Sequence, residues 1–479
     1  MVRHTPPCTG TASMNIYLKE IADRALIEKA AIARAGRLPA GARILAIGDS
    51  ILQFAHRASG PTIENKADGE LNWARAHSPR FRHAVWRDPS ATSASLVPTF
   101  AETSNVDPLF RGANLGLAGD TASGAARRLQ AALNTGAEVI LFAAGTNVGR
   151  ADAPADAVIE AISGAANLIV ASGRRCILGT LRPRRVNLAP SGIQINPARM
   201  QRNLAVNRWI RANAARLGAA LWDPFEALRD HAHDAGDPMH GTDAPGVTRD
   251  GVHLTPRGAH ASALSEARGA RSLARAIDEV IAPGLWFDPD PRKANLLVNG
   301  MLAHDDASRG ADAIAGWSLN ATPATAVSAA LGPAGGDSGL VIDMRGAGGG
   351  AVGQPALVRL QGRARDGQGG TSDHISAFFE VEIEHGGLLL CWQAVLHQGS
   401  AILARGLAQN TGTHHEQPYP AQGFRGWIQT EPTRLTAGPI GVRLDLFARQ
   451  DAAGSARVLV RRALLRAVPD PREEFAWWP

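Results

Sequence analysis

Three residues of the sequence have the types needed to activate a serine nucleophile. Ser50 ends the motif Gly-Asp-Ser, and Asp250 and His253 lie three residues apart in the motif Asp-Gly-Val-His-Leu-Thr-Pro. A serine hydroxyl is a weak nucleophile until a base removes its proton. A histidine serves as that base near neutral pH when a carboxylate fixes its tautomer and stabilises the imidazolium. We therefore expect Ser50, His253 and Asp250 to be nucleophile, base and orienting carboxylate.

Two further residues can stabilise the oxyanion that forms when a serine attacks a carbonyl group. Gly119 lies in the turn motif Gly-Leu-Ala-Gly-Asp, and Asn147 ends the motif Gly-Thr-Asn. The oxyanion needs donors that are already in place where the negative charge develops. The backbone N–H groups of Ser50 and Gly119, together with the side-chain amide of Asn147, can supply three such donors.

The elements that must position these residues alternate between apolar strands and amphipathic helices. Strands are predicted at 42–47, 138–144, 176–181 and 219–222, with a short apolar piece that ends at Asn114. Helical faces are predicted at three places: Val158, Ile162, Ala165 and Ile169; Val206, Ile210, Ala214 and Leu217; Ala270, Leu273, Ile277 and Ile281. This alternation continues to about residue 282 and indicates a parallel sheet covered on both faces. Ligands bind at the carboxyl ends of the strands in such sheets, and the serine, glycine and asparagine motifs follow apolar strands.

Taken in this order, the four motifs resemble those of the SGNH/GDSL hydrolase superfamily, over roughly residues 40–282. The resemblance implies a flavodoxin-like α/β/α domain with esterase or lipase activity. It implies a catalytic triad of Ser50, Asp250 and His253, and an oxyanion hole made by Ser50, Gly119 and Asn147.

Two residues depart from the pattern of the family. Ile51 stands where the family often has leucine, which is a mild change. Val148 stands where it often has aspartate, so a contact behind the Asn147 amide differs while the amide donor itself is kept.

Context, and not spacing, selects one histidine among three. The spacing Asp-x-x-His occurs as Asp230/His233, Asp237/His240 and Asp250/His253. Only His253 is followed by Leu-Thr-Pro, in which Thr255 can cap a helix and Pro256 can be its first residue. We expect that helix to be the last long helix of the domain. A second Gly-Asp-Ser, at 336–338, precedes a strand instead of following one.

Two other motifs suggest chemistry that we do not expect. A loop rich in histidine and aspartate has spacings that a metal ion could use, but a polar loop beside the active site explains it equally well: His231, His233, Asp234, Asp237, His240 and Asp243. Residues 348–353 satisfy Gly-x-Gly-x-x-Gly, yet a β-like segment follows them, so there is no helix N-terminus to hold a pyrophosphate. We expect neither a metal nor a cofactor.

The character of the sequence changes after residue 282. The segment 283–293 contains three prolines and is predicted to be a linker. Beyond it, period-two alternation and glycine-rich turns predict strands at 374–384, 387–396, 442–447 and 455–468. We therefore divide the chain into an N-terminal extension with a helix (1–36), a hydrolase domain (37–282), the linker (283–293) and a jelly-roll-like β-sandwich domain (294–479).

The start of the second domain, from Asn295 to Trp317, is similar to the start of galactose-binding-like jelly rolls, which often serve as carbohydrate-binding modules. A purely structural sandwich that shields the hydrolase domain is the alternative. Aromatic residues that could stack on a sugar are Trp392, Tyr419, Phe424 and Trp427, although Trp392 lies within an apolar strand and fits a core position better. The insertion between Ser50 and Gly119 could form one wall of the substrate pocket. Its aromatic residues, as core or as a platform for a sugar ring or acyl chain, are Trp73, Trp86, Phe100 and Phe110.

The resemblance and the second domain together favour a carbohydrate acetyl esterase acting on a small-molecule or glycan ester. The alternatives are a lipid or short-chain acyl esterase, an acyltransferase, and a carbohydrate-binding or adhesion protein with a vestigial hydrolase domain.

Charge and composition limit the classes of partner that we expect. The net charge is +6, and only four of the 50 basic residues are lysines. No basic stripe with interleaved aromatic residues occurs, so we expect no nucleic-acid partner. The arginines at 182, 184 and 185 could attract an anionic polymer, but we interpret them as ordinary solvated residues. No apolar stretch is long enough to span a membrane, and no signal peptide is evident. A cytoplasmic location is the default expectation, with secretion by another route left open. Three scattered cysteines imply no disulfide framework.

Overall fold

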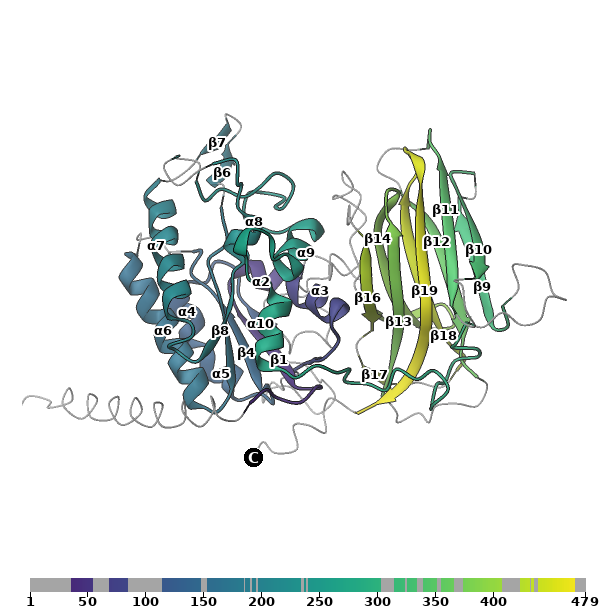
Figure 1. Cartoon of the computed structure of the whole chain (residues 1–479), viewed down its shortest axis with the longest axis horizontal. Helices are drawn as coiled ribbons and strands as arrows, with labels where there is room; N and C mark the ends of the chain where they lie inside the picture. The colour runs from purple at the N-terminus through teal and green to yellow at the C-terminus, as the bar shows by residue number, and fades with distance from the viewer. Residues whose placement is uncertain are drawn as a thin grey trace, which may run out of the picture.

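The fold is taken from a computed structural model (Figure 1). The residues that the structure describes are 36–54, 69–84, 114–147, 153–184, 186–189, 192–194, 197–233, 237, 240–302, 314–323, 325–333, 339–350, 355–365, 374–406, 423–430, 432–434 and 438–469. Several predictions fall outside them: the helix before residue 36, the second Gly-Asp-Ser at 336–338, Val148, Tyr419, and the insertion aromatics Trp86, Phe100 and Phe110.

The N-terminal part contains a parallel sheet. Its strands are β1 (Arg43–Gly48), β2 (Arg82–His83), β3 (Asn114–Gly116), β4 (Val139–Ala143), β5 (Arg175–Gly179) and β8 (Ala219–Trp222). The order across the sheet is β2-β1-β4-β5-β8, with β3 also paired to β1, and every pair is parallel. If β2 and β3 are counted as one edge position, this is the strand order 2-1-3-4-5 of flavodoxin-like sheets. The predicted fold of this part is confirmed.

Helices cover both faces of the sheet (Figure 1). On one face lie α4 (Ala122–Arg127), α5 (Leu129–Leu133), α6 (Ala155–Ala171) and α7 (Pro197–Asn213), and on the other lie α3 (Glu70–His77), α9 (Pro256–Leu264) and α10 (Leu273–Val280). Residues of β1 alternate between the two apolar cores, because Leu45 and Ile47 pack on the α6 side while Ile44 and Ala46 pack on the α10 side. Two short helices, α2 (Ser50–Phe54) and α8 (Pro224–Leu228), and the hairpin β6 (Val186–Ala189) and β7 (Gly192–Gln194) complete this part.

One predicted helix is shorter than expected. The helix that begins after Thr255 is α9, which ends at Leu264, and α10 follows it. The expectation that Thr255 and Pro256 start the last long helix is therefore wrong, although Thr255 is the N-cap and accepts a hydrogen bond from Gly258 N–H. Of the face predicted from Ala270 to Ile281, Leu273 and Ile277 lie on α10, whose start is capped by Ser272, and the other two residues flank that helix.

The C-terminal part consists of two antiparallel sheets. One has the order β10-β11-β19-β13-β16, with β17 also paired to β13, and the other has the order β15-β14-β18-β12-β9. Their bounds are β9 (Trp317–Thr322), β10 (Val327–Pro333), β11 (Leu340–Ala347), β12 (Pro355–Arg363), β13 (His374–His385), β14 (Leu389–Gln398), β15 (Ala401–Gly406), β16 (Phe424–Gln429), β17 (Thr433–Arg434), β18 (Ile440–Arg449) and β19 (Ala453–Val468). Val442, Leu444 and Leu446 of β18 are buried in the core, which confirms the alternation seen in the sequence. The predicted all-β sandwich is thus present.

The segment predicted as a linker packs against the sandwich. Trp286 and Phe287 lie in an apolar cluster with Phe378 and Trp427. The indole N–H of Trp286 donates a hydrogen bond to the Gln429 side chain at 3.0 Å. Because these aromatic side chains join the sandwich, 283–293 is not a plain exposed linker, and the proline pattern alone did not indicate this.

Helix α3 joins the two parts through one tryptophan. Trp73 is 1% exposed and lies edge-on to Trp392 of β14 and Phe424 of β16, with ring centroids 5.8 and 5.7 Å apart. A single apolar cluster includes Ile51, Leu254 and Trp73 as well as the core of the sandwich. Trp73 is therefore core, as are Trp392 and Phe424.

Close backbone approach holds the same contact. A Cβ on Gly426 of β16 would lie 2.1 Å from the carbonyl oxygen of Ala76, so only glycine allows the strand and α3 to come this near. Trp427, the next residue, is also buried. The suggestion that Phe424 and Trp427 stack on a sugar is therefore wrong, because neither side chain is presented to solvent.

Among the residues that the structure describes, no helix is both long and apolar enough to cross a membrane.

Candidate active site

Ser50 lies at a tight turn between β1 and α2. A Cβ on Gly48 would lie 2.1 Å from the carbonyl oxygen of Ala143, so the end of β1 must be glycine to pass the neighbouring strand β4. The Asp49 carboxylate accepts a hydrogen bond from Ile51 N–H at 3.0 Å, which caps the first turn of α2. This local geometry presents Ser50 at the carboxyl edge of the parallel sheet.

A continuous hydrogen-bond chain joins Ser50, His253 and Asp250. His253 Nε2 lies 3.1 Å from Ser50 Oγ, and His253 Nδ1 lies 2.6 Å from Asp250 Oδ2. These lengths allow the serine hydroxyl to donate to one ring nitrogen while the other ring nitrogen donates to the carboxylate. The three residues come from opposite ends of the domain sequence and meet with the relations that a serine nucleophile requires.

The loop that carries Asp250 and His253 is fixed at both ends. Asp250 accepts hydrogen bonds from the backbone N–H groups of Val252 and His253, at 3.0 and 2.7 Å. Gly251 lies between them with φ +80°, a conformation that favours glycine. The backbone N–H of Thr255 donates to Val247 at 3.0 Å, and Thr248 forms an antiparallel bridge with Leu254. The loop is therefore a closed turn, anchored at the start of α9.

The same contacts keep Asp250 ionised. Burial acts to raise the pKa of the Asp250 carboxyl, but the hydrogen bonds from the His253 side chain and backbone outweigh it and hold that pKa well below its usual range. A carboxylate at this position can stabilise a positive charge on His253 when the imidazole takes a proton.

The oxyanion-hole candidates lie at the ends of the next two strands. Gly119 has φ +76° in a turn closed by a hydrogen bond from Asp120 N–H to the Leu117 carbonyl, and Leu117 N–H donates to the Gly48 carbonyl. The Asn147 side-chain amide donates one hydrogen bond to the Asp120 carbonyl at 3.2 Å. An amide carries two N–H donors, so this bond orients the group and leaves the second donor for another acceptor.

Sequence reasoning missed a residue that holds this edge together. Arg128 donates to the Asp120 carboxylate, to the Leu115 carbonyl at 2.6 Å and to the Gly48 carbonyl at 2.9 Å. It thereby ties the serine turn to the glycine turn. Its position between two short helices carries no pattern that would have singled it out in the sequence.

A second missed feature lies directly behind the serine. Asp49 is 1% exposed, and burial raises the pKa of its carboxyl, while the charge of Arg182 acts to lower it. Arg182 itself is buried and donates to the Glu70 carboxylate of α3 at 2.6 and 2.9 Å. The interpretation of Arg182 as a solvated arginine is therefore wrong, since its partner lies more than a hundred residues away in the sequence.

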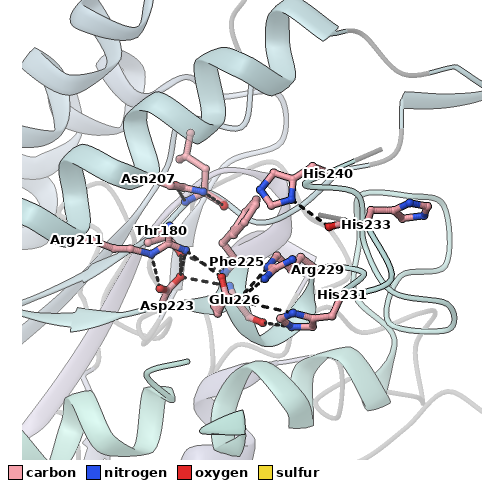
Figure 2. A network of polar contacts seen from close by, with 11 residues as sticks. Thr180, Asn207, Arg211, Asp223, Phe225, Glu226, Arg229, His231, His233 and His240 are labelled. Carbon is pink, nitrogen blue, oxygen red and sulfur yellow. Dashed lines mark hydrogen bonds and ion pairs between the residues drawn. The ribbon is translucent and has the colours of Figure 1, made fainter. Parts of the chain in front are cut away.

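The other two Asp-x-x-His copies differ from the pair beside Ser50. His233 pairs with Asp237, with Nδ1 and Oδ2 2.8 Å apart, while its nearest distance to Asp230 is 3.8 Å. His240 instead contacts the backbone carbonyl of His233, as Figure 2 shows. Neither copy reproduces the Asp–His contact at the predicted spacing.

The histidine side chains of the histidine-rich loop contact other residues of the protein. Figure 2 shows His231 beside Glu226, whose carboxylate also pairs with Arg229 at 2.9 Å. Within the described parts of this loop and of the chain, no group of three histidine, cysteine or acidic side chains is arranged to hold a metal ion. The expectation that the protein needs no metal stays a prediction, because Asp234 lies outside the described residues.

Residues 44–265 match the model of the GDSL-like lipase/acylhydrolase family, and the match spans all four motifs. This part of the chain is similar to the GDSL-like hydrolases, and the similarity supports an ester-bond hydrolase. No match was found among curated proteins.

Solved structures with similarity to the chain include a GDSL-like lipase from Bacteroides thetaiotaomicron, which is 18% identical with a TM-score of 0.30 over 50% of this chain and 92% of that one. An acetyl xylan esterase is 16% identical with a TM-score of 0.30, over 46% of this chain and 94% of its own. A carbohydrate-binding module of the β-sandwich superfamily is 12% identical with a TM-score of 0.23, over 32% of this chain and 58% of its own. Assignment of the GDSL-like domain rests on the family model and not on these likenesses.

Proposed function

We propose that the protein hydrolyses carboxylic esters through an acyl-enzyme on Ser50, with His253 as general base and Asp250 as its orienting carboxylate. The observation that carries the proposal is the hydrogen-bond chain from Asp250 through His253 to Ser50, with lengths of 2.6 and 3.1 Å. Its position at the carboxyl edge of a parallel sheet adds support, since ligands of such sheets bind there.

In the first half of the reaction, His253 Nε2 takes the proton of Ser50 Oγ as the oxygen attacks the ester carbonyl carbon. The carbonyl oxygen becomes an oxyanion, for which the backbone N–H groups of Ser50 and Gly119 and the second N–H of Asn147 are the proposed donors. The imidazolium, stabilised by Asp250, then protonates the departing alcohol. This leaves an acyl group on Ser50.

In the second half, water attacks the acyl carbon and His253 takes its proton. Collapse of the second tetrahedral intermediate breaks the bond to Ser50 Oγ, which recovers its proton from His253. The acid is released and the enzyme returns to its starting state. None of these steps needs a redox partner.

For the substrate we propose an acetylated carbohydrate. What favours it is that a β-sandwich packs directly against the hydrolase domain through α3, although no sugar-binding residue is assigned on that sandwich. A lipid or short-chain acyl ester is the second candidate, and transfer of the acyl group to another alcohol is the third.

The experiment compares Ser50→Ala, His253→Ala and the double variant with His233→Ala as the matched control. Because triad members act as a unit, each of the first three is expected to lower kcat/KM on p-nitrophenyl acetate by roughly 10⁴- to 10⁶-fold, with the double variant no worse than either single one. His233→Ala should stay within a few-fold of the wild type. A fluorophosphonate probe should label Ser50 alone. Normal turnover by His253→Ala would refute the assignment.

A second panel tests the substrate. Acetate release from acetylated xylo-oligosaccharides is compared with hydrolysis of p-nitrophenyl esters of increasing chain length. A carbohydrate acetyl esterase should have its highest kcat/KM on the acetylated sugars and should lose activity as the acyl chain lengthens. Rising activity toward long acyl chains would favour the lipid-type alternative.

A further inference from the structure

Two arginines follow β5 in the sequence Arg182-Pro183-Arg184, and their surroundings differ. Arg182 turns inward and is neutralised by Glu70, at 2.6 Å. Arg184, two residues later, is only half-buried and lies at the segment that carries Asn147. The pair therefore places one ion-paired arginine beside the active site and one arginine that takes part in no ion pair of the described residues.

Within the described part of the chain, the contacts of Arg184 are with backbone groups. Its guanidinium donates to the Thr146 carbonyl at 3.2 Å, and its backbone N–H donates to the Gly241 carbonyl at 3.3 Å. Its Nε is buried, and no described residue forms a hydrogen bond with it. Among the residues that the structure describes, no ion pair involves this side chain.

The charges around Arg184 compensate it only in part. The carboxylates of Asp49 and Asp250 act favourably on its guanidinium, but neither forms an ion pair with it among the described residues, since Asp250 is hydrogen-bonded to His253 and Asp49 accepts from the Ile51 N–H. Arg199 of α7 adds a second positive charge at the same place. Burial and this like charge both lower the pKa of Arg184, which means that they disfavour its charged form.

A partly buried charge that no ion pair neutralises is unfavourable, and binding of a group of opposite charge lowers the free energy. The planar guanidinium fork matches the two oxygens of a carboxylate. Arg184 contacts the carbonyl of Thr146, the residue that precedes the proposed oxyanion donor Asn147. An anionic group on a bound ester would therefore meet this side chain.

We propose that Arg184 binds a carboxylate of the substrate, so that the preferred ester is carried by an acidic sugar, a uronic acid. The proposal rests on the proposed function, since it names the substrate class of the same site. The competing explanation is that Arg184 only holds the Thr146 carbonyl in place, in which case the charge of the sugar would not matter.

The experiment uses two matched esters, the acetylated methyl glycosides of glucuronic acid and of glucose, which differ in a carboxylate against a hydroxymethyl group. The measured quantity is the ratio of kcat/KM for the acidic ester to that for the neutral ester. Wild-type protein should prefer the acidic ester, and Arg184→Gln should lower the ratio by about 10- to 100-fold, as expected for a charge-assisted hydrogen bond. Arg184→Lys should retain part of the ratio because it keeps the charge.

Arg208→Gln is the matched control, because Arg208 is exposed on α7 and its removal changes the net charge equally. It should leave the ratio unchanged, while raising the salt concentration should lower the wild-type ratio. A wild-type ratio near one, or a ratio that Arg184→Gln does not change, would overturn the proposal even if both esters are hydrolysed.

A binding measurement separates failure of this proposal from failure of the proposed function. Calorimetry with methyl glucuronoside and methyl glucoside is carried out on Ser50→Ala protein with and without Arg184→Gln. Tighter binding of the glucuronoside that Arg184→Gln removes would support the anion site even in a protein that hydrolyses neither ester. Equal binding of the two glycosides would overturn it.

Discussion

Gly258→Ala perturbs the catalytic loop without touching a proposed catalytic residue. Gly258 lies in the first turn of α9, where an added Cβ would be 2.0 Å from the Val247 carbonyl oxygen. Even a weak carbon–oxygen contact needs about 3.3 Å, so the carbonyl must move by about 1 Å. That carbonyl accepts the hydrogen bond of Thr255 N–H, which closes the loop containing Asp250 and His253.

A misplacement of about 1 Å at a catalytic group can lower a rate by about 10²-fold. We therefore expect kcat/KM of Gly258→Ala on p-nitrophenyl acetate to fall by about that factor, and the overpacking to destabilise the fold by about 1–3 kcal/mol. The assay is steady-state hydrolysis together with urea unfolding at the same pH.

Gly164→Ala is the matched control for the same substitution. Gly164 lies on α6, and no atom comes within 4 Å of an added Cβ. Alanine is the better helix former, so this variant should be about 0.5–1 kcal/mol more stable and fully active. Unchanged turnover by Gly258→Ala would show that the loop tolerates displacement and would refute the argument that its anchoring sets the catalytic geometry.

Three further predictions follow from the interface and the loops. Gly426→Val should lower the thermal midpoint because its side chain meets the Ala76 carbonyl, whereas Gly332→Val, which has open space around it, should not; equal midpoints would contradict the close packing. Burial lowers the pKa of His260 to about 4, so the unfolded chain binds an extra proton between pH 4 and 6.5. Stability should therefore rise with pH across this window, being about 2 kcal/mol lower at pH 5 than at pH 7 in urea unfolding. His260→Gln should remove most of this difference and the exposed His385→Gln should not. Ester hydrolysis should survive EDTA, and loss of activity that zinc restores would instead assign a metal to the histidine-rich loop.

Strands and helices of the first domain were predictable because their signal is local. Within the predicted strand 138–144, every position after Glu138 is apolar, as a strand buried on both faces must be, and β4 covers Val139–Ala143. The face made by Val158, Ile162, Ala165 and Ile169 is fully buried on α6 for the same reason. Ser50, Gly119 and Asn147 follow strands that all end at one edge of the sheet, whereas Asp250 and His253 lie on the loop before α9, from which His253 reaches Ser50.

The structural features that the sequence did not indicate depend on contacts between residues that are distant along the chain. The burial of Arg182 follows from Glu70, and the role of Arg128 follows from two strands and one turn that its guanidinium reaches at once. The aromatic residues Phe424 and Trp427 have the composition of a sugar-stacking platform. They are buried because α3 and the segment 283–293 pack over them, and no local pattern in the sequence predicts this packing.

The contact between Trp73 and the sandwich affects which truncations of the chain can fold properly. A chain that ended near residue 282 would leave Trp73 and Ile51 without the apolar partners that now cover them, since all belong to one cluster with the sandwich core. Such a fragment would carry an exposed apolar patch beside its own nucleophile and would tend to aggregate. The two halves are therefore not interchangeable modules. A different sandwich could replace this one only if it supplied aromatic side chains that pack around Trp73 and a glycine opposite Ala76. We therefore expect the two parts to be inherited together.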